Sequence, residues 1–120
     1  MQHFNKYRNK ITELDGIKFH SRKEAARYSQ LKLYEKGGLI KDLRLQVKYE
    51  LIPKLTINGK NERAISYIAD FVYIDTVHNN EVVEDVKGMQ TDTFKIKYRL
   101  MKLIHNIDVK ITWHRNLYCW

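Results

Sequence analysis

The chain has 120 residues, 43% of them hydrophobic and 30% charged, which is the composition of one folded domain with a single core. Its single cysteine, Cys119, excludes an internal disulfide and a multi-cysteine metal site, and fits a reducing compartment. No stretch approaches the roughly 18 to 20 apolar residues of a membrane span, and residues 1–10 lack the apolar core of a secretion signal. The sequence therefore predicts a cytoplasmic protein with one domain over residues 1–120, no membrane partner and a flexible basic lead at residues 1–10.

The formal net charge is +8, and the surplus lies in the first half of the chain. Residues 1–60 carry 14 Lys/Arg and 6 Asp/Glu, whereas residues 61–120 carry 8 of each. Such asymmetry is typical of a surface that faces a polyanion, so it predicts DNA as a partner. A basic surface that only keeps the protein soluble is the alternative.

A helix is predicted over residues 22–36, after a turn at Asp15-Gly16 between two short extended pieces. Ser21 and Glu24 match a capping box at its start, and the two glycines that follow residue 36 end it. One side of this helix is apolar, with Ala25, Tyr28, Leu31 and Tyr34.

Three strands are predicted next. Residues 43–51 alternate between apolar and polar side chains in strict period two, which indicates a strand with one buried face. After a hairpin turn at the Asn-Gly pair 58–59, residues 64–74 are apolar on both faces, as in a central strand. A turn at residues 78–80 leads into a third strand at residues 81–87.

A second helix follows, with Thr91 or Asp92 as its cap. Its apolar residues form two neighbouring lines, namely Phe94, Tyr98 and Met101, and Ile96, Leu100 and Ile104. Val109, Ile111 and Trp113 alternate as a last strand. The predicted order of elements is αβββαβ.

Asp70 lies in the middle of the predicted central strand, where a charged side chain is costly. Ile68 and Val72 share its face, and Ala69 and Phe71 take the other. A desolvated carboxylate costs several kcal/mol unless a metal ion or a hydrogen-bond donor meets it. Asp70 is therefore a candidate metal ligand, and a carboxylate that is hydrogen-bonded to backbone near a strand end is the alternative.

Asp85 and Lys87 are two residues apart in the third predicted strand, so their side chains leave one face, with Glu84 and Val86 on the other. An exposed ion pair at a strand end also explains this spacing. If the predicted central strand and the third strand pair as a hairpin through the turn at residues 78–80, Asp70 and Asp85 converge at one edge of the sheet and can share a divalent cation. Carboxylate oxygens favour Mg²⁺ or Mn²⁺. The tandem carboxylates leave the ligand open, and we choose Asp85 because it shares a face with Lys87.

Glu24 stands at the start of the apolar side of the first helix, in line with Tyr28 and Leu31. The capping box explains a glutamate at this position. A helix that covers the sheet can also point its first turn at the carboxylate pair, which makes Glu24 a second candidate ligand.

Other chemistries are excluded by the spacing of the reactive residues. The histidines have no HxxxH or HxH spacing, which disfavours zinc. The chain has no glycine-rich phosphate loop and no nucleophile elbow, so kinase, hydride-transfer and acyl-transfer chemistry are not expected.

The helix with Glu24, the strand with Asp70 in YIADF, and Asp85-Val86-Lys87 in VVEDVKG resemble the PD-(D/E)XK nuclease superfamily. More narrowly, the stretch KYRNKITELDGIKFHSRKEAARY with YIADF and VEDVKG looks like an uncharacterised family of small phage proteins placed in that superfamily. The likeness covers residues 6 to about 113. The layout is also similar to Holliday junction resolvases, phage junction-resolving endonucleases and transposase nuclease subunits. One departure is that the residue before Asp70 is not a proline.

This resemblance implies a single-domain α/β fold with a restriction-endonuclease-like αβββαβ core, in which helices flank a mixed central sheet. It implies a phage-encoded endonuclease that depends on Mg²⁺ or Mn²⁺ and acts in recombination or replication, with Glu24, Asp70, Asp85 and Lys87 as catalytic residues. Asp70, Asp85 and the backbone carbonyl of Val86 would hold one ion, with Glu24 binding it through water or completing a second site. Lys87 would orient the attacking water or stabilise the transition state.

DNA contacts are expected from Gln46, on the polar face of the first long strand, and from the cations around the two helices. These cations are Lys6, Arg8, Lys10, Arg22, Lys23, Arg27, Lys95 and Lys97.

Two other functions are compatible with the sequence. A catalytically silent phage accessory protein with the same fold would bind DNA without metal-dependent cleavage. An interaction protein that captures a host protein would have no salt-sensitive affinity for DNA. A homodimer is also expected, because two coordinated cuts need two sites, and residues 113–120 offer an interface unless they pack on the sheet.

Overall fold

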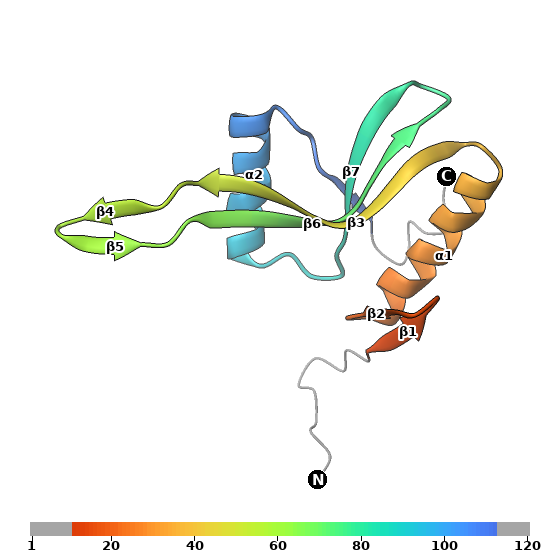
Figure 1. Cartoon of the computed structure of the whole chain (residues 1–120), viewed down its shortest axis with the longest axis horizontal. Coiled ribbons are helices and arrows are strands. Elements are labelled where there is room, and N and C mark those ends of the chain that lie inside the picture. The colour runs from red at the N-terminus through yellow and green to blue at the C-terminus, as the bar shows by residue number, and fades with distance from the viewer. Residues whose placement is uncertain (1–10, 113–120) are drawn as a thin grey trace, which may run out of the picture.

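A four-stranded sheet with the strand order β3-β6-β7-β8 forms the centre of the structure (Figure 1). The computed structural model describes residues 11–112 of the chain. The strands are β3 (Ile40–Ile52), β6 (Ile65–Asp75), β7 (Asn80–Val86) and β8 (Lys110–Thr112). The first three pair antiparallel and β8 pairs parallel to β7, so the sheet is mixed as predicted.

Two helices, α1 (Arg22–Lys36) and α2 (Asp92–His105), cover opposite faces of this sheet. Phe71 and Tyr73 of β6 pack in one apolar cluster with residues of α1. Val72, which lies between them, packs in a second cluster with residues of α2. Since neighbouring residues of a strand point to opposite faces, the two clusters form the two halves of the core. The predicted αβββαβ order is confirmed.

Side-chain caps set where the helices begin. The Ser21 hydroxyl accepts a hydrogen bond of 3.2 Å from the Glu24 backbone N–H, which is half of the predicted capping box. Thr91 rather than Asp92 caps α2, with its hydroxyl 3.1 Å from the Phe94 nitrogen. Asn106 ends α2 in the left-handed conformation, with a φ of 56°.

Two small hairpins are added to this core. The first, β1 (Thr12–Leu14) and β2 (Ile17–Phe19), lies on α1 around the predicted Asp-Gly turn. The second, β4 (Leu55–Ile57) and β5 (Lys60–Glu62), is closed by the predicted Asn-Gly turn and extends the β3–β6 ribbon away from the helices (Figure 1). The sequence predicted both turns but not the short strands β4 and β5.

The two lines of apolar residues predicted on α2 differ in how far the structure buries them. Ile96 and Ile104 are 59% and 46% exposed, whereas Phe94 and Met101 are buried as expected. Leu100, the third residue of the line with Ile96 and Ile104, is partly buried and packs against the cluster that contains Phe94 and Met101. Val109 is buried just before β8, and Trp113 lies outside the described residues.

No helix within residues 11–112 is long and apolar enough to cross a membrane.

Candidate functional site

β3 has a break in its extended backbone at Gln46, where φ is +53°. The register pairs Leu45 with Phe71 and Val47 with Ala69, so Gln46 lies across from Asp70. Leu45 packs in the cluster of α1 and Val47 in that of α2. The ribbon therefore turns from one helix to the other at Gln46 and Asp70. A left-handed conformation is uncommon for a residue with a side chain, and such positions gather at functional sites.

β6 and β7 stop pairing next to Asp70. Their antiparallel register ends at Phe71 and Glu84, and its continuation by one residue places Asp70 directly across from Asp85. At this position the Asp70 carboxylate accepts a hydrogen bond of 2.9 Å from the Val86 backbone N–H. The two carboxylates thus meet where the ladder opens, which is the convergence that the sequence predicted.

Asp70 is held in an environment that disfavours its charge. Burial raises the pKa of its carboxyl well above the ordinary range, and Asp85 and Glu24 raise this pKa as well. A Gln46 amide at 3.5 Å and the Val86 N–H are its hydrogen-bond donors. The backbone contact proposed as the alternative for Asp70 is present, but Asp70 lies well inside β6, which runs from Ile65 to Asp75.

Asp85 is buried, with 1% of its surface exposed, and its Oδ2 atom has no hydrogen-bond partner among the described residues. The nearest cation is the Lys87 Nζ atom, at 3.5 Å from Oδ2. Lys87 also lies over the ring of Phe94, with Nζ 5.0 Å from the centroid. A desolvated carboxylate oxygen that lacks a donor is costly, so this atom calls for a cation or a bound ligand.

The Glu84 side chain lies on the opposite face of β7. Its two oxygens accept hydrogen bonds from Arg27 at 2.6 and 2.9 Å, and the Tyr73 hydroxyl donates a third at 2.6 Å. The sequence left Glu84 and Asp85 open as ligands, and the geometry places only Asp85 beside Asp70 and Lys87.

The predicted DNA contact of Arg27 is wrong. Its side chain is fully buried in the ion pair with Glu84, and Gln30 accepts a further hydrogen bond of 3.0 Å from it. The guanidinium joins α1 to β7 inside the core and has no access to a phosphate.

Glu24 approaches the site from the first turn of α1. Burial raises the pKa of its carboxyl, Asp85 raises it too, and His20 and Lys87 lower it. Glu24 thus lies within electrostatic reach of the strand residues. Within residues 11–112, however, no three His, Cys, Asp or Glu side chains gather into a group that could hold a metal ion. The sheet brings Asp70, Asp85 and Lys87 together, and Glu24 interacts with them electrostatically from the first turn of α1.

The other predicted DNA-binding residues differ in how exposed they are and in what they contact. Arg22 and Lys95 are exposed, Gln46 is exposed beside Asp70, and Lys97 is half-buried. The Lys23 side chain lies against the loop after β7. Its Nζ atom would be only 2.9 Å from a Cβ atom placed on Gly88. Lys6, Arg8 and Lys10, and the tail at residues 113–120, lie outside the described residues.

Sequence patterns did not assign three further residues to the site. Tyr67 has a buried hydroxyl without a hydrogen-bond partner in the described chain, and burial and then Asp85 raise its pKa. Phe94 lies under Lys87, and His20 is close enough to Glu24 to lower the pKa of its carboxyl. Apolar periodicity assigned Tyr67 and Phe94 to the core, which is correct, so no signal marked their second contact.

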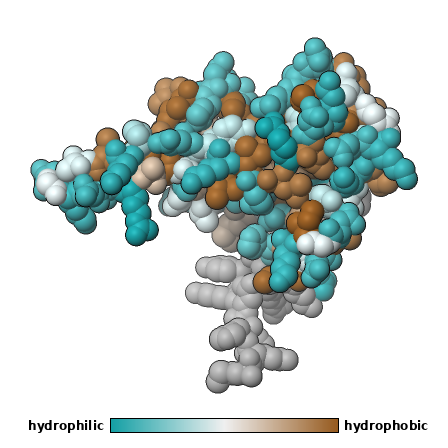
Figure 2. Space-filling model, in the orientation of Figure 1, coloured by the Kyte–Doolittle hydropathy of each residue, from teal (hydrophilic) through white to brown (hydrophobic). Residues whose placement is uncertain are grey.

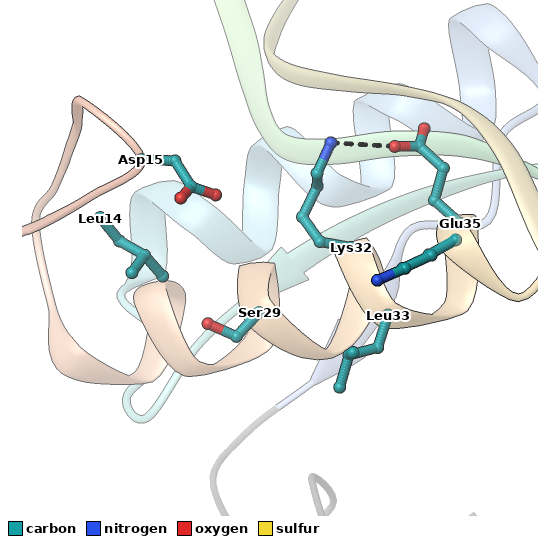
Figure 3. Close-up of a pocket in the computed structure, with 7 residues that line it drawn as sticks. Leu14, Asp15, Ser29, Lys32, Leu33 and Glu35 are labelled. Carbon is teal, nitrogen blue, oxygen red and sulfur yellow. Dashed lines mark hydrogen bonds and ion pairs between the residues drawn. The ribbon is translucent and has the colours of Figure 1, made fainter.

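A cavity of about 630 Å³ lies elsewhere, between the first hairpin and α1 (Figure 3). The ion pair between Lys32 and Glu35, at 3.1 Å, crosses its rim. None of the site carboxylates lines this cavity, which is formed by Leu14, Asp15, Ser29, Lys32, Leu33, Glu35 and Lys36. It is therefore separate from the candidate site.

In a comparison with known families, a family model matches residues 4–118. Comparison with curated proteins gives no match. The matching family is described as a protein of unknown function, DUF1064. Because the match covers nearly the whole sequence, the chain belongs to the DUF1064 family.

Proposed function

We propose that this protein is a metal-dependent endodeoxyribonuclease of the PD-(D/E)XK superfamily that hydrolyses DNA phosphodiester bonds. One observation carries the proposal. Asp70 and Asp85 face each other where β6 and β7 separate, and within residues 11–112 the buried Asp85 Oδ2 atom has no hydrogen-bond partner and lies 3.5 Å from the Lys87 Nζ atom. An anionic pair with one adjacent ammonium is the arrangement expected of a nuclease centre and serves no evident purpose in the core.

The residues present fit a divalent cation of the Mg²⁺ or Mn²⁺ type. Two carboxylates directly opposite each other destabilise a sheet, and the unpartnered Asp85 oxygen adds to that cost. An oxygen-only set suits these hard cations. Asp70, Asp85 and the Val86 carbonyl would hold the ion, with Glu24 reaching it through water. When bound, the ion lowers the pKa of a water ligand and neutralises charge on the phosphate.

Lys87 provides the positive charge beside the scissile phosphate. Its ammonium is fixed between the Asp85 carboxylate and the Phe94 ring, so its position is set before substrate arrives. A preorganised cation of this kind stabilises the charge that develops on the pentavalent phosphorus. Hydrolysis in this superfamily leaves a 5′-phosphate and a 3′-hydroxyl.

We assign substrate binding to polar residues on the elements that carry the site. They are Arg22 and Lys23 on the first turn of α1, Lys95 and Lys97 at the start of α2, and Gln46, which lies beside Asp70 on β3. Cations contact phosphates and set the position of the DNA without reading its sequence. We propose a phage role in recombination or replication, with branched DNA as one substrate.

The test is cleavage of labelled four-way junction, flap and linear duplex DNA by wild-type protein and by Asp85→Asn. Asp108→Asn, an exposed carboxylate in a surface ion pair with Lys102, is the matched control. We expect cleavage with Mg²⁺ or Mn²⁺ that EDTA and Asp85→Asn abolish and Asp108→Asn retains. Equal cleavage by wild type and Asp85→Asn would contradict the proposal.

A catalytically silent DNA-binding protein with the same fold is the second candidate. It is favoured by the finding that the part of the chain described by the structure contains no ready group of three metal-binding side chains. This function predicts salt-sensitive DNA binding with no cleavage under any divalent metal, so the same assay separates the two.

A further inference from the structure

A two-stranded arm projects from the body of the protein. We define the arm as residues 53–64, which comprise β4, β5 and the segments that join them to β3 and β6. It continues the β3–β6 ribbon beyond both helices (Figure 1). All residues from 53 to 64 are exposed, and neither core cluster includes any of them.

The arm is an ordered ribbon. Leu55 pairs with Glu62 and Ile57 with Lys60 in regular antiparallel register. Asn58 and Gly59 have φ values of 52° and 75°, as in the tight turn whose twist matches that of a two-stranded ribbon. Such an element presents a defined surface that the core does not need.

The charge of the arm is positive. The arm contains three cations, Lys54, Lys60 and Arg63, and one carboxylate, Glu62. The Glu62 carboxylate is 3.9 Å from the Lys60 ammonium. Thr56 and Asn61 hydrogen-bond to each other at 3.0 Å across the strands, on the face away from Leu55. Figure 2 shows the arm as largely hydrophilic, whereas hydrophilic and hydrophobic residues are mixed over the body.

We propose that the arm is a DNA-binding element that enters a groove of duplex DNA about one helical turn from the site of cleavage. The distance rests on the proposed function, which fixes the scissile phosphate at Asp70. Ten residues of β6 and the arm separate Asp70 from Lys60, which at about 3.3 Å per residue is roughly 33 Å. One turn of B-DNA is about 34 to 36 Å.

The dimensions and charge of the arm favour DNA over a second copy of the chain. The major groove, about 12 Å wide, admits a two-stranded β-ribbon. The large apolar side chains of the arm are Leu55 and Ile57, which are 43% and 52% exposed, and Pro53 and Ala64 add only small apolar surfaces. A stable protein interface buries about 1,200 to 2,000 Å² in total, which two half-exposed side chains do not supply.

The test compares a triple variant of the arm, Lys54→Gln/Lys60→Gln/Arg63→Gln, with a control that removes three exposed cations elsewhere, Lys18→Gln/Lys36→Gln/Lys102→Gln. Binding to 8-bp and 30-bp duplexes is measured in EDTA over a range of salt, so the result does not depend on cleavage. For the arm variant on the long duplex, we expect at least a tenfold loss of affinity and a slope of log Kd against log salt that is smaller by about 2 to 3. On the short duplex, which cannot reach both the site and the arm, we expect less than a twofold loss.

Several results would overturn this proposal. One is equal affinity of the arm variant and the control on the long duplex. Another is absence of DNA binding by the wild-type protein. A third is a wild-type dimer, by analytical ultracentrifugation, that the arm variant converts to a monomer, because this would make the arm a contact between copies. Wild-type protein that binds DNA in EDTA but never cleaves it would contradict the nuclease and leave the test of the arm intact.

Discussion

At the scale of single residues, the site depends on two carboxylates that the fold places in an unfavourable position. Asp85 is buried, one of its oxygens has no hydrogen-bond partner within residues 11–112, and the pKa of Asp70 is raised by burial and by Asp85. Lys87 offsets part of this charge at 3.5 Å. Groups that function requires are often held at the expense of stability, because selection acts on activity above a stability threshold.

The first prediction is that Asp85→Asn stabilises the metal-free protein. The substitution keeps the shape of the side chain but removes the like charge across from Asp70, and it supplies an N–H donor to the buried pocket. We expect the free energy of unfolding in EDTA to rise by about 1 to 2 kcal/mol. Urea unfolding measures this, with Asp108→Asn as the surface control. A destabilised Asp85→Asn protein would mean that the carboxylate has a structural donor and is not held for a cation.

The second prediction concerns Lys87→Met, which keeps the aliphatic stem over Phe94 and removes the charge. Because the ammonium acts on the charge that develops during hydrolysis, we expect kcat to fall by about 10² to 10³. Divalent metal should still bind, since Lys87 donates no ligand to it. Single-turnover cleavage together with Mn²⁺ titration measures both. If Lys87→Met lost metal binding as well as kcat, the role of Lys87 would be structural.

At the scale of elements, α1 and β7 are joined by a buried ion pair. Arg27 and Glu84 are both fully buried, and Tyr73 completes their hydrogen bonding. Glu84 precedes Asp85, and Arg27 follows Glu24 by three residues, so this pair sets the position of the first turn of α1 relative to the carboxylate site. Replacing one member of a buried ion pair is strongly destabilising, because the charge of the other member is left without a partner.

The third prediction is that Arg27→Met destabilises the protein by about 3 to 5 kcal/mol. Lys32→Met, on the same helix in the exposed pair with Glu35, should change the free energy of unfolding far less. The double variant Arg27→Met/Glu84→Gln should recover part of the loss, because it also removes the unpaired carboxylate. Urea unfolding of the four proteins measures these differences. Equal losses for Arg27→Met and Lys32→Met would show that the buried pair adds no more than a surface contact.

Periodicity predicted most elements but not the partner of each charge. The first helix was predicted at residues 22–36, as observed, because Ser21 and the paired glycines mark its ends. The same helical spacing placed Arg27 four residues before Leu31, on the buried side, which was a readable sign that it faces the core. Its partner Glu84 lies 57 residues away, and local sequence carries no trace of such a pairing. The burial of Arg27 was therefore predictable, and the ion pair was not.

At the scale of the whole molecule, the resemblance to the PD-(D/E)XK superfamily implied the mixed sheet flanked by helices, whereas alternation and capping, which are local signals, predicted the individual elements. Local pattern did not reveal the turn of the ribbon at Gln46, where the apolar face passes from one helix to the other. It also missed the short strands of the arm, since Asn58-Gly59 indicates a turn but not how far the ribbon extends beyond the sheet. The convergence of Asp70 and Asp85 followed from the predicted hairpin, whereas the distance of Glu24 depends on how α1 packs on the sheet.

The most direct test of the central claim, that Asp70 and Asp85 form a divalent cation site, is calorimetric titration of Mn²⁺ into DNA-free protein. Wild type and the Asp108→Asn control should bind Mn²⁺ at one dominant site, and Asp70→Asn and Asp85→Asn should lose that site while they remain folded. Binding by wild type that both substitutions leave unchanged, or no binding by wild type at all, would contradict the claim.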